Sequence, residues 1–338
     1  FPLAGGRSVT ARAAMPTDLP RVAKFLSDAA AVPEAIVGSV LPRALAAGAF
    51  SGWLKLLPGT FGMRTRVRVY LEEYRGRLCS VSLVYAGRRP EWVVLALAAL
   101  PDPSGSEGSF RLLSHIAAAA AQRGMLRVFG AVSDETRPRE TFFQAGFYSY
   151  TRETWYAAPR APLAAPAGRH PGHPARRSDA HDLFRFYVST TPHAVQRAEQ
   201  LTVEDFDIGH RSGAFDPPHL VSGNPLTMRR ATAMIAGEGA GHRPLGFAAS
   251  FRGLDHHPHV LKIRTAGGDT ELARELVRGA SRELDPGRPV TSSVRSYEEH
   301  VARALVGEGF REVATAMLFV RELAVRIEEP ALAPAVVR

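Results

Sequence analysis

Three histidines close together, His256, His257 and His259, are the residues in this sequence whose chemistry is easiest to name. Imidazole nitrogens bind zinc and copper, so a histidine cluster raises the question of a metal site. Neighbouring histidines at a turn before a strand rarely converge on one ion, however, unless a carboxylate or thiolate is also in position. We therefore expect a solvated turn here and no metal.

Arginine supplies almost all of the positive charge. The net charge is +9, and only three of the 42 basic residues are lysines, Lys24, Lys55 and Lys262. A guanidinium binds a phosphate or a carboxylate through two N–H groups, so a basic surface suits nucleic acid or an anionic cofactor. The arginines form scattered doublets, without a run of five or six basic residues. We expect solvated faces, and nucleic acid is not an expected partner.

The bulk composition indicates a folded protein with two domains. A chain of 338 residues exceeds the size at which a single core stops growing. It is 45% apolar and 22% charged, without an apolar run long enough to span a membrane. The single Cys79 excludes an intramolecular disulfide. Residues 1–9 lack the features of a signal peptide, so we expect a cytoplasmic protein with no membrane partner.

A duplication is the main organising feature. Ala11-Arg12 followed by Asp18-Leu19 returns about 164 residues later as Ala175-Arg176 followed by Asp182-Leu183. Each half also ends alike, with a helix running into Gly146-Phe147 or Gly309-Phe310 and then a strand. A period this long exceeds that of solenoid repeats, so it indicates two copies of one domain.

The pattern within each half alternates strands and helices. In the first half we expect a strand at 9–12, helices at 19–30 and 34–50, a hairpin at 64–86, a strand at 91–100 and a helix at 110–123. Residues 158–174 are rich in Pro, Ala and Gly and read as a linker. The expected domains are therefore 1–157 and 175–338. Such alternation predicts an α/β (α+β) fold, each half a mixed central sheet flanked by helices.

This order resembles the GNAT superfamily of acyl-CoA-dependent N-acyltransferases, over residues 9–157 and 175–324. Segments 183–187, 191–199 and 294–297 look like a tandem group within that superfamily. The resemblance implies two GNAT-like domains. It also implies acetyl-CoA as the cofactor and a small amine as the acceptor.

In the superfamily, the loop after the fourth strand holds the CoA pyrophosphate on backbone N–H groups at the start of the next helix. The resemblance places this loop after Leu100 in the first half, and its expected cofactor-binding residues are Leu100, Ser104, Gly105, Ser106, Gly108 and Ser109. Glu107 stands where the pattern has glycine. In the second half Glu271 also stands where the pattern has glycine. Asp269 and Thr270 are candidates for the N-cap of the helix that follows. Both loops are degenerate relative to the family pattern.

Catalytic residues are also carried over from the resemblance. The tyrosine that protonates the leaving thiolate in many GNAT enzymes is replaced by Phe142 and Leu305. Tyr297 is the main nearby candidate for that role, and Tyr148 and Tyr150 are the alternatives. Glu72 or Glu73 occupies the region from which some members recruit a general base. Because strand side chains alternate, only one of these two carboxylates can face the groove.

Two functions from different classes follow. The first is an acyl-CoA-dependent N-acyltransferase in which the amine attacks the thioester directly and the first half holds the cofactor. The alternative is a non-catalytic, degenerate GNAT scaffold that binds a ligand or a partner in the same groove. A monomer and a homodimer are both compatible with the sequence, because the duplication can itself supply a pseudo-two-fold contact.

Overall fold

The computed structural model describes residues 9–31, 36–39, 66–87, 89–99, 107–133, 136–162, 172–207, 228–237, 243–254 and 257–324. The first half contains β1 (Val9–Ala13), η1 (Pro16–Asp18), α1 (Leu19–Ala31), β2 (Ile36–Ser39), β3 (Val67–Tyr74), β4 (Arg77–Ala86), β5 (Glu91–Ala99), α4 (Glu107–Gln122), β6 (Arg127–Ser133), α5 (Thr136–Gln144) and β7 (Tyr148–Ala158).

The second half repeats most of this order. It contains β8 (Gly172–Pro174), η3 (Arg177–Asp179), α6 (Ala180–Thr190), α7 (His193–Glu199), η4 (Val203–Phe206), β9 (Met228–Ala236), β10 (Gly246–Gly253), β11 (His259–Thr265), α9 (Thr270–Ser281), β12 (Val290–Arg295), α10 (Glu299–Gly307) and β13 (Arg311–Glu322). The duplication that the sequence predicts is therefore present in the element order.

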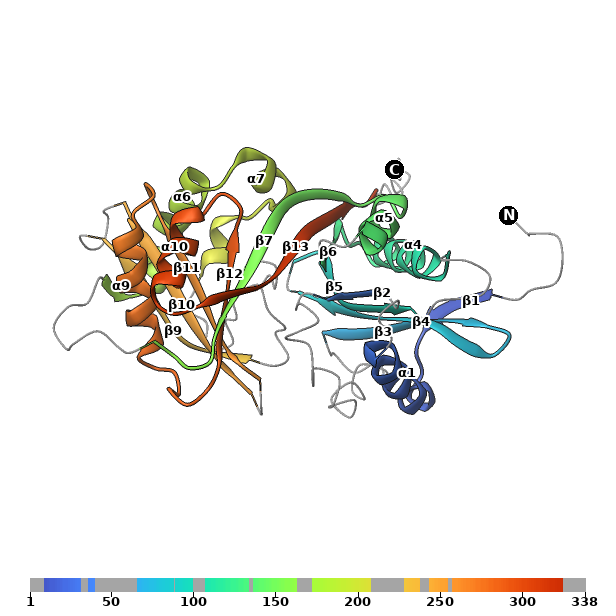
Figure 1. The fold of residues 1–338 in the computed structure, drawn as a ribbon. Helices are drawn as coiled ribbons and strands as arrows, with labels where there is room; N and C mark the ends of the chain where they lie inside the picture. The colour runs from blue at the N-terminus through green and yellow to red at the C-terminus, as the bar shows by residue number, and fades with distance from the viewer. Residues whose placement is uncertain are drawn as a thin grey trace, which may run out of the picture.

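The two halves share one continuous sheet because they exchange their last strands. The strand order is β1-β3-β4-β5-β6-β13-β7-β12-β11-β10-β9-β8, and β2 pairs with β5 off this path. The last strand of the second half, β13, pairs with β6 of the first, while β7 pairs with β12 of the second half. The exchanged strands also pair with each other, and Figure 1 shows β7 and β13 running side by side between the halves. Neither half therefore completes its own sheet.

Helices cover both faces of the sheet in each half. In β3 the side chains alternate, so that Val69 and Leu71 join the core on the α1 face while Tyr70 joins the core that contains residues of α4 and α5. In the second half one core contains residues of α9 and α10, and the other contains residues of α6 and η4. Each half is thus a three-layer α/β unit, as the alternating pattern predicts.

The sequence pattern pairs Asp18 with Asp182, but in the structure the residue equivalent to Asp18 is Asp179. Asp18 accepts a hydrogen bond from the backbone N–H of Met15 at 2.8 Å, and this turn leads into α1. The equivalent contact in the second half is made by Asp179, which accepts from the N–H of Arg176 at 2.6 Å. The match to Asp182 is wrong by one helical turn, because Asp182 already lies within α6.

The expected helix at 34–50 is also wrong at its start. Residues Ile36–Ser39 form β2, which pairs antiparallel with β5, and residues 40–50 lie outside the described part of the chain. β-branched residues suit a strand wherever a free sheet edge offers hydrogen-bond partners, and Ile36-Val37 meets the edge of β5. Among the described residues, no helix is long and apolar enough to cross a membrane.

Candidate functional site

A wedge opens in the second half between two parallel strands. β11 and β12 are paired only at His259↔Val290, Val260↔Thr291 and Leu261↔Ser292. Beyond Leu261 no described strand pairs with this edge of β11. Four polar side chains, Lys262 and Arg264 of β11 and Ser293 and Arg295 of β12, follow the point of separation and are all buried. Buried charges require partners, so the surroundings of these residues define the site.

The first partner is a carboxylate from the exchanged strand β7. Glu153 Oε1 lies 3.5 Å from Lys262 Nζ and 3.3 Å from Arg295 Nε. Lys262 also donates to Ser293, 3.3 Å from its hydroxyl oxygen and 3.4 Å from its carbonyl oxygen. One carboxylate of the first half thereby bridges two cations of the second half.

The second partner comes from α7. Glu199, the last residue of that helix, accepts from Arg295 Nη2 at 3.2 Å and from the Tyr187 hydroxyl at 2.8 Å. The neighbouring Ala198 packs in the core of the first half, so α7 is fixed at the junction of the two halves. Because α7 is fixed there, Glu199 at its end lies beside Arg295 in the wedge.

The third partner is Glu298, which follows β12. Its Oε1 lies 3.2 Å from Arg264 Nε, and its Oε2 accepts the backbone N–H of Arg295 at 3.1 Å. The remaining nitrogens of Arg264 reach the Thr191 hydroxyl at 3.3 Å and the Tyr297 hydroxyl at 3.4 Å. Arg264, near the end of β11, is therefore held by the residue that caps α6 and by two residues of the turn after β12.

We call these six residues the buried charge cluster: Lys262, Arg264, Arg295, Glu153, Glu199 and Glu298. Burial lowers the pKa of Lys262 to about 8, against the attraction of Glu153. Burial also lowers the pKa of Arg264 and Arg295, but neighbouring carboxylates more than offset it and the net direction is upward. The formal charges balance, three positive against three negative, as a stable buried ion network requires.

Tyr297 lies at the partly exposed rim of this cluster. Burial of its hydroxyl raises its pKa to about 12, although Arg264 opposes the shift. A phenol with this pKa keeps its proton at neutral pH. In the structure the Tyr297 hydroxyl accepts from Arg264 Nη2, and its own proton is available to a ligand.

The equivalent wedge of the first half is occupied by the chain itself. β5 and β6 pair in parallel from Glu91↔Arg127 to Val94↔Gly130 and then separate. The freed edge of β5 pairs antiparallel with β2, in register from Ile36↔Ala99 to Ser39↔Ala96. A ligand that needs the backbone of this edge must compete with β2.

Solved structures are similar to this fold over nearly the whole chain. A GCN5-related N-acetyltransferase from Sphaerobacter thermophilus is 13% identical over 95% of this chain and 98% of its own, with a TM-score of 0.52. A tandem GNAT protein from the clavulanic acid biosynthesis pathway is 12% identical over 95% of this chain and 100% of its own, with a TM-score of 0.51. The chain has the tandem GNAT fold. No family model matches the sequence, and no curated protein matches it.

The two candidate bases lie on opposite faces of the first GNAT sheet, as strand alternation predicts. Glu72 is fully buried; it accepts from the Ser80 hydroxyl at 2.9 Å and pairs with Arg111 Nε of α4 at 2.6 Å. Glu73 is paired with Arg12 at 3.1 Å and with Arg21 at 2.9 Å on the α1 face. Both carboxylates are engaged by arginine side chains. Their catalytic role stays a prediction.

Most of the expected cofactor loop of the first half lies outside the described residues. This applies to Leu100, Ser104, Gly105 and Ser106. Gly108 and Ser109 lie in the first turn of α4, and Ser109 is buried. The assignment of these six residues to cofactor binding also stays a prediction.

The loop of the second half offers space but not a free helix end. Gly267 and Gly268 have φ values of 70° and 76°, and nothing lies within 4 Å of where their Cβ atoms would be. Asp269 caps α9, as expected, because its side chain accepts the N–H of Leu272 at 2.9 Å. A diphosphate at this helix end would face the carboxylates of Asp269 and Glu271.

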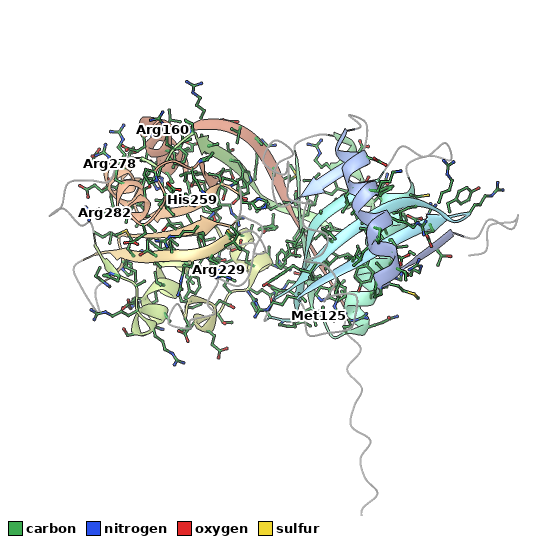
Figure 2. The ribbon with its side chains drawn as sticks, turned by 90° about the horizontal axis from the view of Figure 1, so that it is seen from below. Met125, Arg160, Arg229, His259, Arg278 and Arg282 are labelled. Carbon is green, nitrogen blue, oxygen red and sulfur yellow. The ribbon has the colours of Figure 1, made fainter. Side chains whose placement is uncertain are left out.

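The histidine segment is not the solvated turn that we expected throughout. His259 is buried in β11, and Figure 2 shows it among the strands of the second half. Its ring nitrogens lie 3.0 Å from the N–H of Gly253 and 3.2 Å from that of Asp285, and burial lowers its pKa. His256 lies outside the described residues. Within the described part of the chain, no three metal-type ligands come together.

Sequence reasoning named Tyr297 but missed the charges behind it. Lys262 carried a signal, since it is one of three lysines in an arginine-rich chain and interrupts the apolar run Val260-Leu261-Lys262-Ile263. Glu153 and Glu199 carried no signal for this site. Glu153 reaches the wedge because β7 is exchanged between the halves, and Glu199 reaches it because α7 ends there.

Proposed function

We propose that this protein is an acyl-CoA-dependent N-acyltransferase that uses the wedge between β11 and β12 of its second half. One observation carries the proposal: among the described residues no strand pairs with this edge of β11 beyond Leu261, whereas β2 pairs with the matching edge of β5. The N-acetyltransferase named among the similar structures supports the reaction class. The first half would then serve mainly as a scaffold that supplies β7 and Glu153.

The bound acyl-CoA would supply a thioester carbonyl to an amine, so that a C–N bond forms as the C–S bond breaks. The amine must lose a proton and the leaving sulfur must gain one. Backbone N–H groups on the open edge of β11 can donate to the carbonyl oxygen, and the Tyr297 hydroxyl can donate at the mouth of the wedge. We expect the acceptor to be a small amine.

The different pKa values of Tyr297 and Lys262 suit them to different roles in the reaction. An ordinary thiol has a pKa of about 8.5. Tyr297, at about 12, holds its proton too tightly to give it up readily to such a thiolate, and it therefore serves as a hydrogen-bond donor. The pKa of Lys262, about 8, lies close to that of the thiol and close to neutral pH, so its amine can both lose and gain a proton. We assign Lys262, with Glu153 beside it, to the movement of the proton within the cluster.

The test is thiol release from acetyl-CoA with a panel of small amines, together with calorimetric titration of acetyl-CoA. We expect Tyr297→Phe to lower kcat by about 10- to 100-fold with little change in donor binding. Tyr148→Phe is the matched control, because that exposed tyrosine only donates to Glu322 at 3.0 Å. Absence of acetyl-CoA binding at millimolar concentration would overturn the proposal.

A second candidate is a non-catalytic scaffold that binds a ligand or partner in the same groove. Two features favour it: β2 pairs with the edge of β5, and the Asp269 side chain already accepts an N–H group at the start of α9. A scaffold predicts no thiol release with any amine, even where a ligand stabilises the fold. The Tyr297→Phe variant would then behave as wild type in every assay except ligand binding.

A further inference from the structure

A cluster of aromatic and basic side chains lies on the α4 face of the first half, away from both wedges. Trp92 of β5 is buried, and the guanidinium groups of Arg68 and Arg123 lie over its ring, 5.8 Å and 5.9 Å from the centroid. Trp92 is paired with Val128 of β6, so it precedes the point at which these strands separate. Two cations therefore gather at the closed end of the strand pair.

A buried hydroxyl faces the same cluster. The Tyr70 ring packs 5.9 Å from Trp92 and 5.8 Å from His115, measured between ring centroids. The Tyr70 hydroxyl is buried and has no hydrogen-bond partner among the described residues, and Arg68 Nε is in the same condition. Arg123 and Arg68 both oppose the rise in the pKa of Tyr70 that burial causes, which places their charges near the hydroxyl.

Within the described part of the chain, Arg68 and Arg123 have no acidic partner. Among the described residues, no carboxylate forms an ion pair with Arg68 or Arg123; Arg123 donates only to the carbonyl of Ala119, at 3.2 Å. Glu72, two residues after Tyr70, is engaged by Arg111 and Ser80 instead. Residues 40–65, which lead into β3, contain no Asp or Glu at all. The preceding segment therefore cannot supply a carboxylate.

Among the described residues, two positive charges lack a counter-charge and two buried donors lack acceptors, and together they are complementary to one kind of ligand. A buried donor without an acceptor costs free energy, and a small anion would supply acceptors to both groups. Arginine binds carboxylates and phosphates through two N–H groups at once. We propose that Arg68, Arg123 and Tyr70 form a binding site for a small oxyanion, a phosphate or carboxylate group, independent of the acyltransfer wedge.

The decisive variant is Tyr70→Phe, because the proposed site predicts that this change keeps or raises stability but weakens oxyanion binding. Removing an unsatisfied buried hydroxyl should leave the ligand-free protein as stable as wild type or more stable. The same change should weaken oxyanion binding by about tenfold, since a donor to a charged group is lost. Thermal unfolding and calorimetric titration with sodium phosphate give the two numbers. A Tyr70→Phe protein that binds phosphate as wild type does would overturn the proposal.

Charge variants and ion controls complete the test. Phosphate should raise Tm above that in sodium chloride of equal ionic strength, because only a bound ion stabilises by mass action. Arg68→Gln and Arg123→Gln should each abolish this difference, whereas Arg252→Gln, at an exposed ion pair in the second half, should keep it. Sodium acetate in place of phosphate distinguishes a carboxylate from a phosphate as the source of the oxyanion. Equal Tm values in chloride and in every oxyanion would sink the inference.

Discussion

Glu199 and Arg295 meet at 3.2 Å with both side chains fully buried, although one ends helix α7 and the other ends strand β12. Arg295 also lies 5.9 Å from the centre of the Tyr150 ring and 3.3 Å from Glu153. Both of those residues belong to β7, which the first half contributes. The ion cluster of the second half is thus completed by the first half.

Removal of Glu199 should be strongly destabilising. Glu199→Ala leaves the buried Arg295 with one fewer carboxylate, and breaking a buried pair in this way costs about 3–5 kcal/mol. The free energy of unfolding in urea measures the loss. Glu283→Ala is the control, because its ion pair with Arg252 is 3.4 Å long and more than half exposed, so its loss should cost about 0–1 kcal/mol. Equal losses in the two variants would contradict the assignment.

Lys262 should make stability rise with pH in the alkaline range. Its pKa falls from 10.5 to about 8 on folding, so between these values the unfolded chain binds more protons than the folded one. Wild type should therefore gain stability, on the order of 3 kcal/mol, relative to Lys262→Met as pH rises from 8 to 10.5. Unfolding of both proteins across this range gives the difference. A constant difference would show that Lys262 keeps its ordinary pKa.

Glu91 should act in the opposite sense near neutrality. Burial raises its pKa from 4.5 to about 7, although Arg89 and Arg127 oppose the shift. Between those values the folded protein holds the proton and the unfolded chain has lost it, so stability falls as pH rises. Wild type should lose stability relative to Glu91→Gln between pH 4.5 and pH 7. Parallel unfolding curves over that range would contradict the shift.

The exchanged strands predict that the halves are not independent. Segments 1–157 and 175–338, expressed separately, should each be poorly soluble because each lacks one strand of its sheet. Expressed together, with a tag on one only, they should be recovered as a complex. Two stable monomers that do not associate would contradict the exchange of β7 and β13.

The cap of α9 predicts an effect on the cofactor. Asp269→Asn keeps a side-chain acceptor for the Leu272 N–H but removes a negative charge from the helix start. If the diphosphate of CoA lies there, its affinity should rise about two- to fivefold, which calorimetry can resolve. Glu283→Gln is the control for net charge. An unchanged affinity for CoA in Asp269→Asn would indicate that the diphosphate lies elsewhere.

The sequence predicts the fold better than the site, for a physical reason. Hydrophobic alternation, Gly-Phe endings and turn residues are local, and they predict the order of strands and helices in both halves. Lys262 meets Glu153 across 109 residues of sequence and Arg295 meets Glu199 across 96, and no local pattern records these pairings. The segment at Ile36–Ser39 shows the same limit, because a free strand edge, not local propensity, decides that it is a strand.

The exchange of last strands has a consequence for synthesis on the ribosome. The inner edge of β6 stays unpaired until Arg311–Glu322 has emerged, since β13 is its partner there. For the time needed to translate the second half, the nascent first half therefore presents an exposed strand edge that can pair with other chains. We expect chaperone dependence during this interval, and a slow codon region near the end of the chain should lower the soluble yield more than one near the linker.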